Sequence, residues 1–161
     1  MEAKETNITP QAELPILEVE HLRVQFTSDS GTTTAVVDES FSIRPGETLA
    51  LVGESGSGKS VTSKAILGIL AGNSIVEGGE ILFDGKDLLR ISEDEMYKIR
   101  GDKIAMIFQN PMTCLNPVYT IGNQLVEALR AHDKKISKEE AQKRAMEMME
   151  LVGINNVEKR M

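Results

Sequence analysis

The stretch that decides the fold is Leu49–Leu70, "LALVGESGSGKSVTSKAILGIL". It begins with a short apolar run, continues through a loop of glycine and serine, and ends in a helical pattern. The eight residues 53–60, "GESGSGKS", match the phosphate-binding pattern G-x-x-x-x-G-K-(S/T). In such a loop, successive backbone N–H groups must point inward at phosphate oxygens, and glycine adopts the necessary backbone angles at low cost. The sequence therefore predicts a phosphate site between a strand at 48–52 and a helix at 59–71.

The predicted helix adds to this site, because its unpaired N–H groups and the positive end of its dipole would point at the same phosphates. Lys59 would reach the β- and γ-phosphates, and the Ser60 hydroxyl would coordinate Mg²⁺. In the empty site we expect Lys59 to face solvent. The alternative is a flexible Gly/Ser connection, but the apolar run before the loop and the helix after it favour a nucleotide site. The predicted nucleotide-binding residues are Gly53, Glu54, Ser55, Gly56, Ser57, Gly58, Lys59, Ser60 and Val61.

Composition limits the other classes of protein. The chain has 161 residues, a formal charge of −7 and 40 % hydrophobic residues, which fits one compact domain of ordinary size. The acidic balance disfavours a nucleic-acid partner. The single cysteine, Cys114, allows no internal disulfide. No apolar run approaches the roughly 20 residues that span a bilayer, and the polar N-terminus has no apolar signal region. We therefore expect a cytosolic protein that reaches a membrane only through a partner.

The apolar pattern also predicts strands. From Ile16 onward the apolar positions alternate and then shift parity, which indicates one strand with a bulge near Glu20–His21. A turn-rich loop is expected at 27–34. Three further strands are expected at 35–43, in the segment before a tight turn at Asp84–Gly85, and in the buried run 103–109. Because Asp84 precedes Gly85 in this turn, "ILFD" at 81–84 is interpreted as structural and not as a Walker B strand.

Two helices have recognisable capping boxes. Ser92 with Glu95 begins a short helix, and Ser137 with Glu140 begins a longer one. The longer helix is expected to end at Gly153 and to bury four side chains on one face: Ala141, Ala145, Met148 and Met149. The chain is therefore mixed α/β, with strands first and a helical segment last.

The text after the phosphate loop carries a family resemblance. "GGEILFDGKDL", followed by "KIAMIFQNPMTCLNPVYTIGNQLVEAL", resembles the ATP-binding subunits of ABC transporters, and within them the oligopeptide/dipeptide importer branch. The resemblance runs from about Ile16 to the last residue. It implies an α/β P-loop NTPase (ABC ATPase) core with an antiparallel β subdomain and the start of a helical subdomain, incomplete. The expected domains are a disordered tail at 1–14, the core and β subdomain at 15–109, and a Q-loop hinge with the beginning of the helical subdomain at 110–161.

The resemblance also implies roles for single residues. Gln109 falls on the family's Q-loop glutamine, which reaches Mg²⁺ and the attacking water; the alternative is an ordinary glutamine at a strand end. Phe26 is similar in position to the aromatic residue that stacks on adenine; the alternative is a core phenylalanine. The segment Asn110–Gly122 would be the hinge that contacts the transmembrane subunits, through Met112, Leu115 and Val118, unless these fold back on the core.

Several family motifs are absent from the 161 residues. After Gln109 no apolar run ends in Asp-Glu, and neither the LSGGQ-type signature nor the switch histidine follows. The sequence therefore resembles the first half of an importer ATPase, and we expect it to be inactive alone. The alternatives are an inert nucleotide-binding module or a soluble P-loop kinase or GTPase, although no Asn-Lys-x-Asp motif supports the latter.

The resemblance finally implies cofactors and partners. The cofactors are ATP and Mg²⁺. The partners are a second ABC ATPase subunit, transmembrane permease subunits and, indirectly, an extracytoplasmic peptide-binding protein, with no nucleic acid. The expected location is cytoplasmic, peripheral on the inner face of the cell membrane through the permease subunits.

Overall fold

A computed structural model describes residues 14–110 and 114–161. The chain divides into two compact units, Met1–Met96 and Tyr97–Met161, and each is described by itself. The predicted disordered tail falls almost wholly outside the described residues, as does Met112. The predicted boundary between residues 109 and 110 remains a prediction.

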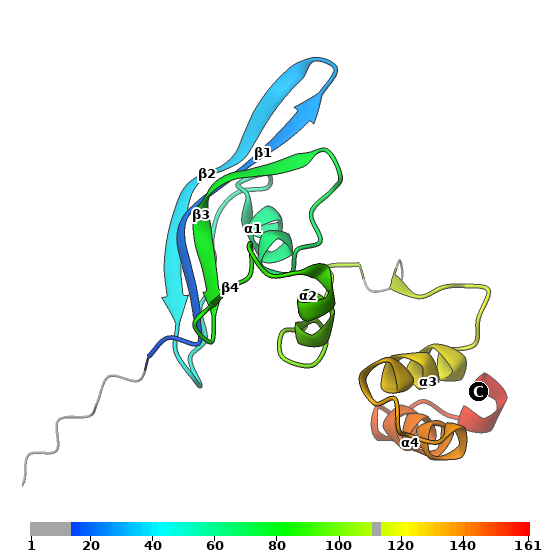
Figure 1. Cartoon of the computed structure of the whole chain (residues 1–161). Helices are drawn as coiled ribbons and strands as arrows, with labels where there is room; N and C mark the ends of the chain where they lie inside the picture. Colours follow the sequence, from blue (N-terminus) through cyan, green and yellow to red (C-terminus); the bar gives the residue numbers. More distant parts are fainter. Residues whose placement is uncertain (1–13, 111–113) are drawn as a thin grey trace, which may run out of the picture. The chain divides into compact units, whose positions relative to one another are not determined.

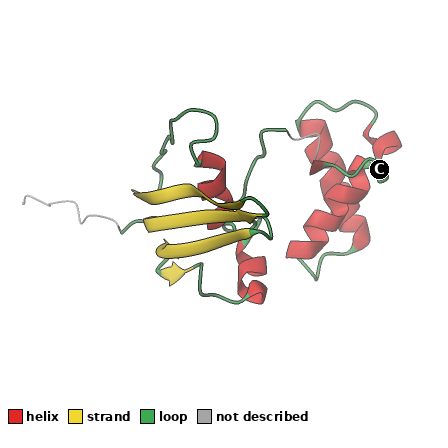
Figure 2. Cartoon of the chain, turned by 90° about the horizontal axis from the view of Figure 1, so that it is seen from above, coloured by secondary structure: helices red, strands yellow, loops and turns green. Residues whose placement is uncertain are grey.

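The first unit is built on one antiparallel sheet (Figures 1 and 2). Its strands are β1 (Leu17–Ser28), β2 (Gly31–Ile43), β3 (Ser74–Phe83) and β4 (Lys86–Asp87), in the order β2-β1-β3-β4. One helix, α1 (Lys59–Ile66), lies beside this sheet and contacts β2. The core of the unit is aliphatic and includes the fully buried side chains of Val19, Leu22, Val24 and Ile81.

The predicted bulge in β1 is confirmed. The pairing of β1 with β3 shifts between Glu20 and Arg23, and His21 has a positive φ of 50°. This shift lets β1 bury Val19 and then Leu22 on the same face. On β3, Gly79 makes room for the bulge, because a Cβ there would lie 2.5 Å from the Glu20 carbonyl oxygen.

The predicted loop at 27–34 is wrong. β1 and β2 stay paired up to Ser28 and Gly31, so only Asp29 and Ser30 remain in the turn. Three threonines at 32–34 pair across the hairpin, which suits their β-branched side chains. The second strand, expected at 35–43, is confirmed inside β2. The turn after β3 is also confirmed: Asp84 and Gly85 both have positive φ, as a two-residue hairpin of this kind requires.

Two expected strands are not formed. Residues 48–52 have no strand pairing, and residues 103–109 contribute only one isolated bridge, between Arg100 and Ile104. A strand exists only when a neighbour completes its hydrogen bonds, and these apolar runs find none among the described residues. Several of their side chains are open to solvent, with Val52 93 % exposed and Ile107 95 % exposed, whereas Leu51, Ile104 and Met106 are half-buried.

Helix α1 is shorter than the expected 59–71. It stops because Gly68 adopts a positive φ of 61° and its N–H donates to the Ala65 carbonyl at 3.0 Å. The N–H of Ile69 donates to the Lys64 carbonyl, also at 3.0 Å. This pair of bonds is a Schellman motif, which ends a helix at a glycine.

Helix α2 (Glu93–Ile99) spans the division between the units, and its capping box is confirmed. The Glu95 N–H donates to Ser92 Oγ at 3.3 Å, and the Ser92 N–H donates back to Glu95 Oε2 at 3.3 Å. The reciprocal bonds satisfy two of the donors that a helix start leaves unpaired.

The second unit contains α3 (Ile121–His132), α4 (Lys138–Leu151) and the 3₁₀ turn η2 (Val157–Arg160). Helices α3 and α4 pack side by side (Figures 1 and 2). Ser137 caps α4 as expected, since Ser137 Oγ accepts from the Glu140 N–H at 3.1 Å.

The face that α4 buries is confirmed at three of its four predicted positions. Ala141, Ala145 and Met149 are buried, and the two alanines pack with Val126 of α3. Met148 was predicted wrongly, because it is 47 % exposed. Met148 lies at the edge of this face: on the helical wheel it is about 20° from Ala141, on the side away from Ala145 and Met149.

Candidate nucleotide-binding site

The predicted phosphate loop occupies residues 53–58 and leads directly into α1. Gly56 and Gly58 have φ values of 85° and 93°, a region that favours glycine. Gly58 is the N-cap of α1, where no side chain forms a cap and no acidic residue occupies the first turn. The positive end of the helix dipole therefore has no compensating charge from its own first turn, which suits it to an anion.

Lys59 lies inside this loop. Its Nζ donates to the carbonyl oxygens of Gly53 and Glu54, both at 2.7 Å, and to Ser57 Oγ at 3.0 Å. The expectation that Lys59 faces solvent in the empty site is therefore wrong: the side chain is half-buried and held by three loop oxygens. These bonds place a positive charge at the centre of the curve made by residues 53–57.

The loop has the tight interior that a phosphate cradle needs. A Cβ added to Gly53 would lie 2.6 Å from Ser57 Oγ and 3.8 Å from Lys59 Nζ, so only glycine leaves this space free. The Ser57 N–H donates across the loop to the Glu54 carbonyl at 3.2 Å. A positive charge, glycine backbone and a helix N-terminus thus lie together, and this arrangement fits the phosphates of a nucleotide.

The remaining loop residues differ in their surroundings. Ser55 and Ser60 are exposed, and the Ser60 hydroxyl has no hydrogen-bond partner within the described parts of the chain. It is therefore available to ligate a cation. Val61 is half-buried on α1. In the described residues, no group of three or more His, Cys, Asp or Glu side chains could hold a metal by itself.

The start of α1 is fixed on β2, and the residues that fix it were missed by sequence reasoning. A Cβ on Gly58 would lie 2.7 Å from the Ala35 carbonyl oxygen, which shows how closely the backbones approach. One turn later the fully buried Thr62 donates its hydroxyl proton to Glu39 Oε2. The available signal was Thr62 itself, a polar residue three positions before Ala65 on the apolar face of the helix.

The two site residues outside the loop are placed as follows. Phe26 lies near the end of β1, half-buried, between Thr33 of β2 and Ser74 of β3. Gln109 belongs to the second unit, is exposed and forms no hydrogen bond with any described residue. The expectation that Gln109 ends a buried strand is wrong, since 105–108 is not paired. The loop residues are thus brought together, whereas Gln109 and the loop belong to different units.

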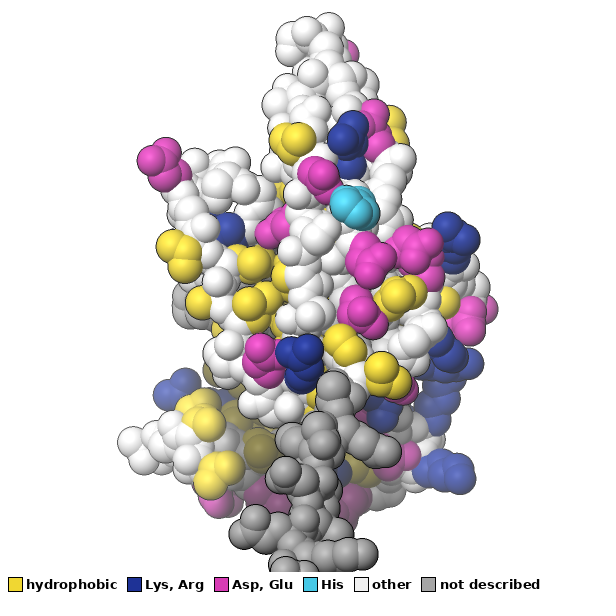
Figure 3. Space-filling model, turned by 90° about the vertical axis from the view of Figure 1, so that its left-hand side faces the viewer, with side chains coloured by type: hydrophobic (Ala, Val, Ile, Leu, Met, Phe, Trp, Pro, Cys, Tyr) yellow, Lys and Arg dark blue, Asp and Glu magenta, His cyan; other side chains and the backbone are white. Residues whose placement is uncertain are grey.

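The two units differ in charge. Residues 1–96 contain 17 Asp and Glu against 7 Lys and Arg, whereas residues 97–161 contain 8 against 11. Several acidic side chains lie close together on the side of the molecule that carries the strands (Figure 3). The Lys59 ammonium at the phosphate loop therefore belongs to a unit in which acidic residues outnumber basic ones.

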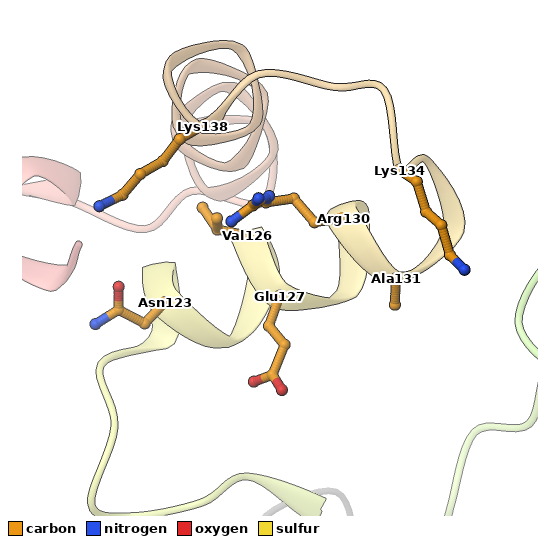
Figure 4. Close-up of a pocket in the computed structure, with 7 residues that line it drawn as sticks. All are labelled: Asn123, Val126, Glu127, Arg130, Ala131, Lys134 and Lys138. Atoms are coloured by element: carbon orange, nitrogen blue, oxygen red, sulfur yellow. The ribbon is translucent and has the colours of Figure 1, made fainter.

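The second unit has a shallow hollow of about 570 Å³ along α3 and the start of α4 (Figure 4). Arg130, Lys134 and Lys138 line it, and the carboxylate of Glu127 points in a different direction from the Arg130 guanidinium. None of these three cations forms an ion pair with a described residue. This surface accounts for part of the unit's positive charge. None of the described helices has the length and hydropathy needed to cross a bilayer.

The loop and its helix define a nucleotide-binding protein, and comparison with known families gives the class. Residues 36–161 match the ABC transporter family. The chain therefore belongs to the ABC transporter family, as the sequence resemblance predicted. This membership sets aside the alternative of a soluble P-loop kinase or GTPase.

Three curated relatives show the branch. The dipeptide transport ATP-binding protein DppD of Lactococcus lactis subsp. cremoris is 50 % identical over 91 % of this chain and 42 % of its own length. The oligopeptide transport ATP-binding protein OppD of Bacillus subtilis is 52 % identical over 90 % of this chain and 40 % of its own length. The dipeptide transport ATP-binding protein DppD of Bacillus subtilis is 54 % identical over 86 % of this chain and 42 % of its own length. The chain spans about two fifths of the length of these relatives.

Solved structures confirm the fold class. The ATP-binding cassette MJ0796, in a dimeric post-hydrolysis state bound to ADP and Pi, superposes with a TM-score of 0.71 at 26 % identity. The match covers 84 % of this chain and 56 % of that one. The chain is thus part of an ABC ATPase cassette, with its antiparallel sheet and the helices that follow.

Proposed function

We propose that this chain is the nucleotide-binding portion of an ATP-binding subunit of an ABC importer for oligopeptides or dipeptides. The observation that carries the proposal is the Lys59 ammonium, held within the glycine loop by three oxygens at the N-terminus of α1. The names of the relatives, which are dipeptide and oligopeptide transport proteins, support the substrate class.

The loop residues have distinct roles in this proposal. The backbone of residues 53–58 and the Lys59 ammonium would hold the phosphates of ATP, and Ser60 would hold Mg²⁺. Bound Mg²⁺ would supply charge neutralisation between the phosphates. On the free chain, Lys59 must exchange its neutral carbonyl partners for phosphate oxygens, which is favourable because the ammonium then pairs with an anionic acceptor.

Phe26 and Gln109 are proposed to act on either end of the nucleotide. Phe26 is half-buried at a strand end, which leaves part of its ring able to stack on a base. Gln109 is exposed and its carboxamide is not engaged with described residues, so it is able to contact Mg²⁺ or water.

The partners proposed are a second ATPase subunit and transmembrane permease subunits, with an extracytoplasmic peptide-binding protein acting through the permeases. The chain would then be peripheral on the cytoplasmic face of the membrane. Within the segment after Gln109, Leu115 is 44 % exposed and Val118 is exposed, which fits docking of a partner helix. Leu115→Glu should weaken co-purification with the permease subunits; normal co-purification with a lowered melting temperature would make Leu115 a packing residue.

Isothermal titration of the purified chain with Mg-ATP tests the nucleotide site. Lys59→Ala should raise the dissociation constant by about 10-fold or more, since a hydrogen bond to a charged group contributes about 1.5–3 kcal/mol. Lys64→Ala, which removes the same charge from the last turn of α1, is the control and should leave the dissociation constant unchanged. Equal affinities for the wild-type chain and Lys59→Ala would refute the assignment of the loop.

A second candidate is a nucleotide-binding module that binds ATP without turning it over. It is favoured by the sequence after Gln109, which contains no apolar run ending in paired carboxylates. Both candidates predict that the 161-residue chain binds Mg-ATP without turning it over. Co-purification with permease subunits separates them, because only an importer subunit should bind those partners.

A further inference from the structure

The inference begins with Thr62, the one polar residue among the buried side chains of the described residues. None of its surface is exposed. A buried hydroxyl needs hydrogen-bond partners, and Thr62 Oγ1 has two: it donates to Glu39 Oε2 and lies 3.3 Å from the Gly58 carbonyl oxygen. The longer contact is the ordinary backward bond of a helical threonine, so Glu39 is the partner supplied by the tertiary fold.

Glu39 reaches α1 because of its place on β2. Its neighbours Asp38 and Ser40 both contact His21: Asp38 Oδ1 lies 2.9 Å from His21 Nδ1, and the His21 N–H donates to Ser40 Oγ at 2.8 Å. Side chains alternate along a strand, so Glu39 lies on the opposite face from both of them. On that face it is half-buried and pairs across the strands with Leu22, which is fully buried.

The N-terminal turn of α1 is thereby attached to β2 at two points. Gly58 approaches the Ala35 carbonyl so closely that a Cβ would lie 2.7 Å from it, and Thr62 bonds to Glu39. Ala35 and Glu39 are four residues apart on β2, on either side of a register shift in its pairing with β1. Lys59 and Ser60 lie between the two attachments in the helix.

We propose that Glu39 is a positioning residue for the phosphate site: its carboxylate, through Thr62, fixes the helical turn that carries Lys59 and Ser60. This inference rests on the proposed function, because the site is taken to bind Mg-ATP. It adds a residue that lies outside the loop, on a different element, and that contacts neither the phosphates nor the cation.

Calorimetric titration of the whole chain with Mg-ATP, together with urea unfolding, tests the proposal. Glu39→Ala and Thr62→Val should each raise the dissociation constant about 5- to 10-fold, and the double variant should be no worse than either single one, because both remove the same contact. Glu39→Gln and Thr62→Ser keep an acceptor and a hydroxyl, and should remain within about twofold of the wild-type constant. The matched control is Asp38→Ala, which removes a carboxylate from the opposite face of the same strand and should leave the constant unchanged.

The outcomes separate this inference from the proposed function. If Glu39→Ala and Thr62→Val lower the free energy of unfolding but not the affinity of the folded chain, the contact is only structural and the inference fails. If Glu39→Ala does not fold, the dissociation constant of Thr62→Val alone tests the inference, because valine keeps the shape of threonine. If the wild-type chain binds no Mg-ATP, or Lys59→Ala binds as well as wild type, the proposed function fails and the inference fails with it. Loss of affinity in Lys59→Ala with none in Thr62→Val overturns the inference alone.

Discussion

The substitution Gly58→Ala gives the sharpest test of how the phosphate loop is attached to the sheet. Gly58 has a φ of 93°, and a Cβ there would lie 2.7 Å from the Ala35 carbonyl oxygen and 3.3 Å from Val36 Cγ2. The first contact is to backbone, which cannot rotate away. Alanine must therefore either leave the left-handed conformation or separate α1 from β2.

The expected loss of stability has two parts. Placing a non-glycine residue at positive φ costs about 1–2 kcal/mol, and forcing an extra carbon into a close contact costs about 1–3 kcal/mol. The sum is about 2–5 kcal/mol, a large share of the roughly 5–15 kcal/mol that stabilises a typical domain. Gly46→Ala is the matched control: Gly46 has a φ of 75° but nothing within 4 Å of its Cβ position, so only the conformational part applies.

Urea unfolding followed by circular dichroism measures both variants against wild type. The free energy of unfolding should fall for Gly58→Ala by about 1–3 kcal/mol more than for Gly46→Ala, with the same dependence on denaturant. Equal losses for the two variants would refute the close approach of α1 to β2. A gain in stability for Gly58→Ala would refute the left-handed conformation as well.

Three further predictions concern the rest of the chain. Met149→Ala should lower the free energy of unfolding of the helical unit by about 2–4 kcal/mol, and Met148→Ala by less than about 1 kcal/mol, because Met149 is 1 % exposed and Met148 is 47 % exposed; equal effects in thermal melts would contradict the assigned phase of α4. Ser137→Ala should cost about 1 kcal/mol by removing the N-cap of α4, and an unchanged melting temperature would show that the cap adds nothing. The purified 161-residue chain should release no phosphate from saturating Mg-ATP above background, since its sequence after Gln109 has no apolar run that ends in Asp-Glu, the pair expected to orient water; a rate abolished by Ser60→Ala would show that a catalytic group was overlooked.

The features that the sequence predicted well are local ones. The start of α1 at Lys59, the capping residues Ser92 and Ser137, and the turn at Asp84–Gly85 each depend on residues within a few positions of one another. The bulge in β1 was also predictable, because the alternation of apolar and polar residues along the strand shifts by one position there. In each case the physical cause lies inside the segment that was considered.

The failures have a common cause, which is dependence on a distant partner. The apolar runs 48–52 and 103–109 have the composition of buried strands, but a strand also needs a neighbour for its backbone groups, and composition does not reveal one. Met148 was misplaced because residues 148 and 149 both belong to the apolar face that the helical period predicts, and only the packing of α4 shows that Met149 is buried and Met148 lies at the exposed edge. Glu39 and Thr62 are 23 positions apart, and only the folded chain shows that they meet.

In the part of the chain that the structure describes, the lack of a strand partner for residues 48–52 affects how the phosphate loop is held in place. The segment before the loop, 48–52, has no strand partner among the described residues, so it cannot hold the loop from that side. The helix after the loop is fixed on β2 by the close approach at Gly58 and by the bond from Thr62 to Glu39. Among the described residues, contacts with β2 therefore fix the start of α1, whereas the Lys59 ammonium itself is held by loop oxygens. A phosphate site supported in this way depends on the antiparallel sheet. Substitutions on the face of β2 that contacts α1, such as Glu39→Ala, should therefore affect nucleotide binding more than substitutions in 48–52.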